Sequence, residues 1–86
     1  QLIDVREPYE YEIANLGAIL IPKGEILKHL DEIDRTKDVV ILCRSGKRSQ
    51  DVIDLLKQEE GLTNLYNLKG GILAWADEID PSMAKY

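Results

Sequence analysis

The stretch VVILCRSGKRS, residues 39–49, decides the fold that we predict for this chain. Its first four residues, Val39 to Leu42, are apolar without the polar alternation of a half-solvated strand, which is typical of a strand buried on both faces in a parallel sheet. Residues 44–49 then form a turn, and the apolar residues that follow have helical spacing until Gly61 ends the helix (Val52, Ile53, Leu55 and Leu56). The stretch therefore predicts a central strand, a tight turn and a helix, in that order.

The rest of the chain alternates between strands and helices in the same way. Short β-prone runs at residues 2–5, 18–21 and 65–68 predict three more strands, and helical patterns cover residues 8–14, 25–34 and 72–79. The segment 25–34 carries its apolar residues on one stripe of an α-helix (Ile26, Leu27, Leu30 and Ile33). Such alternation predicts an α/β fold in which a parallel sheet is flanked by helices on both faces.

Length and composition limit the classes of protein that fit. With 86 residues, of which 44% are hydrophobic, the chain forms one small domain over residues 1–86. A β-prone run begins almost at residue 1, so we expect the domain to be trimmed at its N-terminus or cut from a longer chain. The net charge of −5 opposes binding to nucleic acid or an anionic membrane, and the longest apolar run, residues 39–43, is far below the roughly 20 residues that span a bilayer. We therefore expect a soluble, cytoplasmic protein.

A single cysteine, Cys43, leaves the central strand at its carboxyl end, where open α/β sheets bind ligands. One Cys and one His exclude a disulfide scaffold and a zinc finger, and we expect no metal or organic cofactor. A free cysteine is often only a small buried hydrophobe. Here three of the eleven basic residues follow within five positions (Arg44, Lys47 and Arg48), and Gly46 permits a tight turn. Cations and a helix N-terminus lower a thiol pKa, so this turn predicts a reactive thiolate.

Three segments carry a family resemblance: LIDVRE at 2–7, CRSGKRS at 43–49 and KGGILAW at 69–75. In this order and spacing they resemble the signature segments of rhodanese-like sulfurtransferase domains. The resemblance implies a three-layer rhodanese-like domain in which Cys43 carries sulfane sulfur as a persulfide. It also implies that the loop after the cysteine cradles that sulfur and binds the donor (Arg44, Ser45, Gly46, Lys47, Arg48 and Ser49).

The tail at residues 75–86, together with residues 12–15, resembles the C-terminal rhodanese domain of fusions with adenylyltransferases of the molybdopterin and thiamine type. This resemblance implies a sulfur donor that is either thiosulfate or a cysteine desulfurase persulfide. It implies two partners, a ubiquitin-like sulfur-carrier protein and an adenylyltransferase domain.

Asp4 and Arg6 follow the first strand and lie on the same side of a parallel sheet as Cys43. We expect them to support the active loop through an ion pair or loop hydrogen bonds. Two other functions stay open at this point. One is a Cys-dependent phosphatase or arsenate reductase, although the phosphatase loop is one residue longer than the stretch from Cys43 to Arg48 and arsenate reduction by an internal disulfide needs a second cysteine. The other is a noncatalytic interaction module, against which the presence of Cys43 counts.

Overall fold

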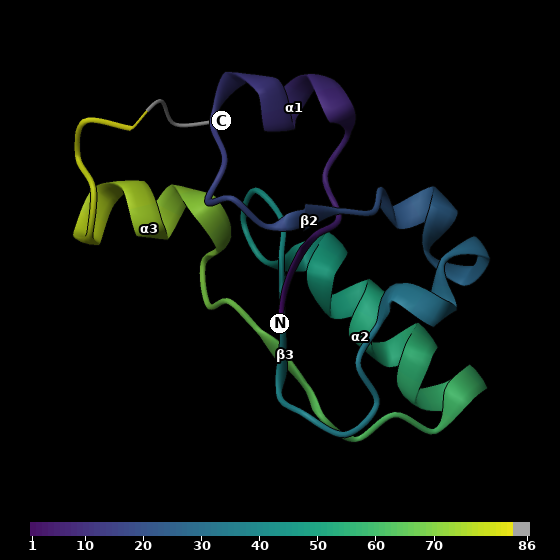
Figure 1. Ribbon diagram of the computed structural model, residues 1–86. Coiled ribbons are helices and arrows are strands. Elements are labelled where there is room, and N and C mark those ends of the chain that lie inside the picture. The colour runs from purple at the N-terminus through teal and green to yellow at the C-terminus, as the bar shows by residue number, and fades with distance from the viewer. Residues whose placement is uncertain (84–86) are drawn as a thin grey trace.

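The computed structural model describes residues 1–83, and its elements alternate as the sequence pattern predicts (Figure 1). Residues 84–86, the end of the tail segment on which the resemblance to adenylyltransferase fusions rests, lie outside the described residues. The elements in chain order are β1 (Leu2–Asp4), α1 (Pro8–Ile13), β2 (Ile19–Leu20), the 3₁₀ helices η1 (Lys23–Lys28) and η2 (Leu30–Glu32), β3 (Val39–Leu42), α2 (Lys47–Glu60), β4 (Leu65–Asn67) and α3 (Gly71–Glu78).

The four strands form one parallel sheet in the order β2-β1-β3-β4. β3 lies between β1 and β4, with Ile41 opposite Ile3 on one side and opposite Asn67 on the other. Its residues Val39, Ile41 and Leu42 are fully buried, because neighbouring strands cover both edges and helices cover both faces. The prediction of a central buried strand at 39–42 is therefore confirmed.

Helices cover both faces of the sheet, which gives the three-layer α/β arrangement that we expected (Figure 1). Because successive side chains of a strand point to opposite faces, Ile41 packs with Val52 and Leu56 of α2, whereas Leu42 packs with Ile72 of α3. The first face carries the larger cluster of buried side chains. Both helices thus meet the same strand, immediately before Cys43.

One predicted element is wrong: residues 25–34 do not form a single α-helix. The segment consists of η1 and η2, which are separated at His29 by a non-helical backbone conformation. A 3₁₀ helix has three residues per turn, so the four apolar residues do not share one stripe. The break at His29 allows Ile26 and Ile33 both to reach the core, while Leu27 stays exposed.

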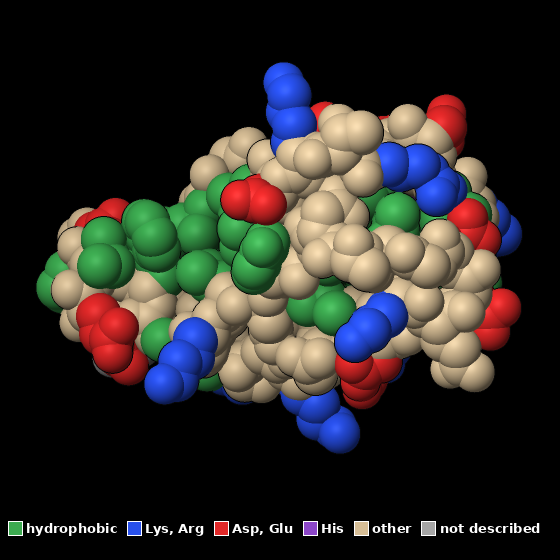
Figure 2. Space-filling view, turned by 90° about the horizontal axis from the view of Figure 1, so that it is seen from below, with side chains coloured by type: hydrophobic (Ala, Val, Ile, Leu, Met, Phe, Trp, Pro, Cys, Tyr) green, Lys and Arg blue, Asp and Glu red, His purple; other side chains and the backbone are tan. Residues whose placement is uncertain are grey.

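The helix α3 extends to one end of the molecule, where hydrophobic side chains gather on the surface (Figure 2). The helix is held through its buried residues Ile72 and Ala76, whereas Ile79, just after its end, is 62% exposed. Within residues 1–83, none of the helices combines the length and the apolar character that crossing a bilayer requires.

Candidate active site

Cys43 lies at the end of β3 and is 1% exposed, with its sulfur surrounded by hydrogen-bond donors of the following turn. The backbone N–H of Gly46 donates to Sγ at 3.0 Å and that of Ser49 at 3.4 Å. The Ser49 hydroxyl lies 3.4 Å from the same sulfur. Gly46 adopts a left-handed conformation with φ of 105°, which allows the chain to turn around the sulfur before α2 begins at Lys47. The loop is thus built around a single atom.

The N-terminus of α3 holds the outer side of this loop. The N–H groups of Ile72 and Leu73 donate to the carbonyl oxygens of Cys43 and Arg44 at 2.9 and 3.1 Å. These bonds hold the two carbonyls against the start of α3 and satisfy donors that the start of a helix leaves unpaired. Gly71 makes the approach possible, because a Cβ at this position would lie 2.5 Å from both carbonyl oxygens.

The pKa of the Cys43 thiol lies below its ordinary value. Burial of the group raises the pKa, but the hydrogen bonds from the Ser49 hydroxyl and from the N–H groups of Ser49, Gly46 and Ser45 outweigh burial. The expected lowered pKa therefore has a physical basis in the donors that the turn and the start of α2 aim at the sulfur.

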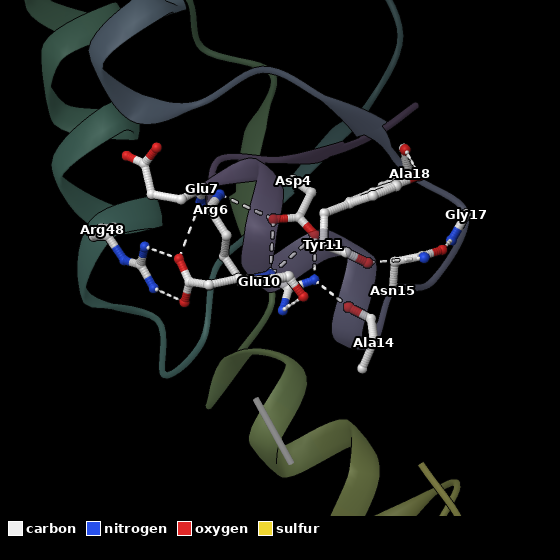
Figure 3. Close-up of polar contacts among 10 residues, drawn as sticks. All are labelled: Asp4, Arg6, Glu7, Glu10, Tyr11, Ala14, Asn15, Gly17, Ala18 and Arg48. Carbon is white, nitrogen blue, oxygen red and sulfur yellow. Dashed lines mark hydrogen bonds and ion pairs between the residues drawn. The ribbon is translucent and has the colours of Figure 1, made fainter. Parts of the chain in front are cut away.

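The predicted loop cations differ from one another in their surroundings. Arg44 and Lys47 are exposed, as is Ser45. Arg48 is 32% exposed, and its two terminal nitrogens donate to the two carboxylate oxygens of Glu10 on α1 at 2.6 and 2.8 Å (Figure 3). The structure gives Arg48 an internal carboxylate partner, which compensates much of its charge.

Asp4 and Arg6 form the predicted ion pair, fully buried, with Arg6 Nη2 2.8 Å from an Asp4 carboxylate oxygen. Arg6 also donates to the carbonyls of Glu10 and Ala14 at 3.3 and 2.6 Å, which ties α1 to the end of β1 (Figure 3). Arg6 thus joins the end of β1 to α1, and Glu10 of the same helix holds Arg48.

Three residues of the site were missed by the sequence analysis: Glu10, Asn67 and Gly71. Asn67 ends β4 and accepts a hydrogen bond from the Ser49 hydroxyl at 2.5 Å. A glycine pair directly before a helix signals close backbone approach, so Gly71 could have been singled out. Glu10 stands at the third position of α1, where it forms a capping box with Glu7, but this local pattern does not predict its contact with Arg48.

The hydrogen-bond donors of the site are directed at the sulfur of Cys43 itself. The Arg48 guanidinium faces Glu10. Among residues 1–83, no three His, Cys, Asp or Glu side chains are placed to hold a metal ion together.

A family model described as "Rhodanese-like domain" matches residues 1–78. The chain is 42% identical over 91 residues to the probable adenylyltransferase/sulfurtransferase MoeZ of Mycobacterium tuberculosis, an alignment that covers 99% of the chain and 22% of MoeZ. Among solved structures, a rhodanese-related protein from Thermoplasma volcanium matches with a TM-score of 0.81 and 33% identity, over 91% of this chain and 77% of that one. An NAD-dependent persulfide reductase from A. fulgidus matches with a TM-score of 0.69 and 37% identity, over 83% of this chain and 13% of the reductase.

The chain thus spans about a fifth of the length of MoeZ. The similarity covers nearly all of the chain, including β1, the Cys43 loop and the start of α3.

Proposed function

Because this chain belongs to the rhodanese-like family, we propose that it is a sulfurtransferase that carries sulfane sulfur as a persulfide on Cys43. One observation carries the proposal: two N–H groups and one hydroxyl of residues 46–49 surround the Cys43 sulfur, which ends a buried strand. These donors favour the thiolate, which is the nucleophilic form of cysteine. A chain that used this fold only for docking would have no need of them.

The reaction that we propose has two sulfur transfers. The Cys43 thiolate attacks the outer sulfur of a donor such as thiosulfate, a new S–S bond forms, and sulfite leaves with the electron pair of the broken S–S bond. An acceptor such as cyanide or a thiolate then attacks the outer sulfur of the persulfide and releases the Cys43 thiolate. No proton, metal or redox cofactor is needed for either step, because electrons stay paired and the charge is conserved.

We extend the proposal to the donor, the acceptor and the location of the protein. The exposed cations Arg44 and Lys47 flank the loop and would attract an anionic donor, either thiosulfate or the persulfide of a cysteine desulfurase. Since MoeZ is named as a probable adenylyltransferase/sulfurtransferase, the acceptor that we propose is a ubiquitin-like sulfur-carrier protein activated by an adenylyltransferase domain, in molybdopterin or thiamine-type biosynthesis. Such an assembly would work in the cytoplasm.

Intact-mass measurement tests the persulfide directly. Incubation of the chain with thiosulfate should add about 32 Da, the mass of one sulfur atom, and cyanide should remove the added mass with formation of thiocyanate. Cys43→Ser should gain no mass, whereas Ser82→Ala, which changes an exposed side chain outside the loop, should gain mass as the unmodified chain does.

Absence of a mass gain with both thiosulfate and a small persulfide donor would overturn the proposal and favour a docking module. Hydrolysis of an aryl phosphate that depends on Cys43, without any sulfur gain, would identify a phosphatase. Against that activity, the loop is one residue shorter than the phosphatase signature, and Arg48 is paired with Glu10.

A further inference from the structure

The buried hydroxyl of Ser49 has more partners than it has protons. Its Oγ lies 2.5 Å from Asn67 Oδ1, 3.1 Å from the Gly46 carbonyl oxygen and 3.4 Å from Cys43 Sγ. A serine hydroxyl donates one hydrogen bond at a time. Ser49 is fully buried, so water does not supply another donor. Only one of these three partners can therefore receive the Ser49 hydroxyl proton at a time.

The hydrogen bonds of the Asn67 side chain show which of its two polar atoms faces Ser49. Its Nδ2 donates to the Gly46 carbonyl at 2.9 Å and to Gln50 Oε1 at 3.2 Å, both of which are acceptors. The amide oxygen of Asn67 is therefore the atom that faces Ser49, and it can only accept. When Ser49 donates to Asn67, the Cys43 S–H donates to Ser49, and the three groups form a directed chain that suits the protonated thiol.

A thiolate requires the opposite direction. It has no proton to donate, so Ser49 must turn its own proton toward the sulfur, and Asn67 Oδ1 loses its short hydrogen bond. After sulfur transfer the negative charge lies on the outer sulfur, and the inner Sγ, now bonded to carbon and sulfur, is a weak acceptor. The proton can then return to Asn67.

We propose that Asn67 is a positioning residue that competes with the Cys43 sulfur for the Ser49 proton, so that Ser49 donates to the free thiolate and to Asn67 once Cys43 carries sulfur. This inference rests on the proposed persulfide function. Asn67 then opposes the thiolate and favours the loaded state. Of the charged groups near the loop, Glu10 is paired with Arg48 and Asp4 with Arg6, and Arg44 and Lys47 lie exposed at the surface. The hydroxyl proton is the group that changes partner.

The test is the pKa of the Cys43 thiol, read from the pH dependence of its alkylation by iodoacetamide. In Asn67→Ala the Cys43 sulfur has lost its strongest competitor for the Ser49 proton. We expect a lower thiol pKa and, below that pKa, alkylation faster by roughly threefold to tenfold, which is the worth of one hydrogen bond. Discharge of the loaded persulfide by cyanide should accelerate by a similar factor, because the loaded state has lost its alternative acceptor.

A double-mutant cycle separates this role from mere support of the loop. Ser49→Ala should raise the thiol pKa, and in that background Asn67→Ala should leave the pKa unchanged. Asn64→Ala is the matched control, because Asn64 precedes the same strand and donates to the Asp34 and Lys37 carbonyls, which come before β3, whereas the loop follows β3. It should leave the thiol pKa as it is.

The proposal would be overturned if Asn67→Ala shifted the thiol pKa equally with and without the Ser49 hydroxyl. It would also be overturned if Asn67→Ala raised the thiol pKa or left it unchanged. If Asn67→Ala does not fold, Asn67→Asp is used in its place. Its carboxylate is still an acceptor for the Ser49 proton, so Asn67→Asp must raise the thiol pKa more when Ser49 is present than in the Ser49→Ala background. If the chain gains no sulfur mass but the cycle shows coupling, the sulfurtransferase function fails while the proton competition stands.

Discussion

Glu10 on α1 and Arg48 on α2 form a bidentate ion pair across 38 positions of sequence, with oxygen to nitrogen distances of 2.6 and 2.8 Å. The Glu10 side chain is nearly buried, and Glu10 also accepts a hydrogen bond from the Glu7 N–H at 3.0 Å. The pair joins the first helix to the turn that follows Cys43. It thereby connects the folding of the N-terminal segment to the shape of the active loop.

This pair predicts a specific loss of stability in acid. The hydrogen bond from Arg48 lowers the pKa of Glu10 from 4.5 to about 2, against the opposing effect of burial. Since the folded pKa is the lower one, the stabilisation is complete above about pH 4.5 and is lost as the pH falls toward 2, by about 3 kcal/mol. The free energy of unfolding, measured with urea between pH 2 and 6, should decrease as the pH falls. Glu10→Gln should lack the part of this pH dependence that comes from the Glu10 carboxyl group. An unchanged pH dependence in Glu10→Gln would contradict the pairing.

Arg48→Ala should destabilise the domain, because it leaves the Glu10 carboxylate buried without its partner. We expect a cost of about 2 kcal/mol, and thus a melting temperature lower by roughly 10 °C. Lys47→Ala is the matched control, since Lys47 is exposed in the same turn and should melt like the unmodified chain. If Arg48→Ala keeps its melting temperature but raises the KM for thiosulfate, Arg48 binds the donor, as the sequence analysis expected.

Arg6→Met should cost more than any substitution in a surface ion pair. It leaves Asp4 charged and fully buried and removes the donors to the Glu10 and Ala14 carbonyls, so we expect a loss of about 3 kcal/mol or more in the free energy of unfolding. The comparison is Lys23→Ala, which breaks the half-exposed pair with Asp51 and should cost less than about 1 kcal/mol. Similar costs in the two variants would show that the buried pair adds no special support.

Gly71→Ala and Gly61→Ala form a matched pair, because both glycines have φ of 65°. Around Gly61 no atom would contact an added Cβ, so alanine there should cost about 1 kcal/mol through left-handed strain alone. At Gly71 the same Cβ meets the Cys43 and Arg44 carbonyls, and the total should reach about 3 kcal/mol. Because those carbonyls orient the loop, Gly71→Ala should also slow alkylation of Cys43. Equal stability and reactivity in the two variants would contradict the role of α3 in holding the loop.

Local patterns determined most of the fold. The apolar run at 39–42 predicted the central strand, since only a strand covered on both faces can be apolar throughout. Gly61, in the left-handed region, ends α2 where the pattern placed the stop. The segment 25–34 shows the limit of this reasoning, because apolar spacing reports which residues are buried and does not fix the helix type.

The sequence by itself determined the alternating α/β fold, the position of Cys43 at the end of the central strand, the family resemblance and a structural role for Asp4 and Arg6 as an ion pair or through loop hydrogen bonds. Each of these depends on residues close together in the chain or on segments whose order is diagnostic. Only the tertiary structure decided that Arg48 faces Glu10, that Asn67 reaches Ser49 and that Gly71 lies against the Cys43 loop. The physical reason is that hydrogen bonds and ion pairs act over about 3 Å, and a chain with sixteen acidic residues offers each arginine many partners until folding selects one.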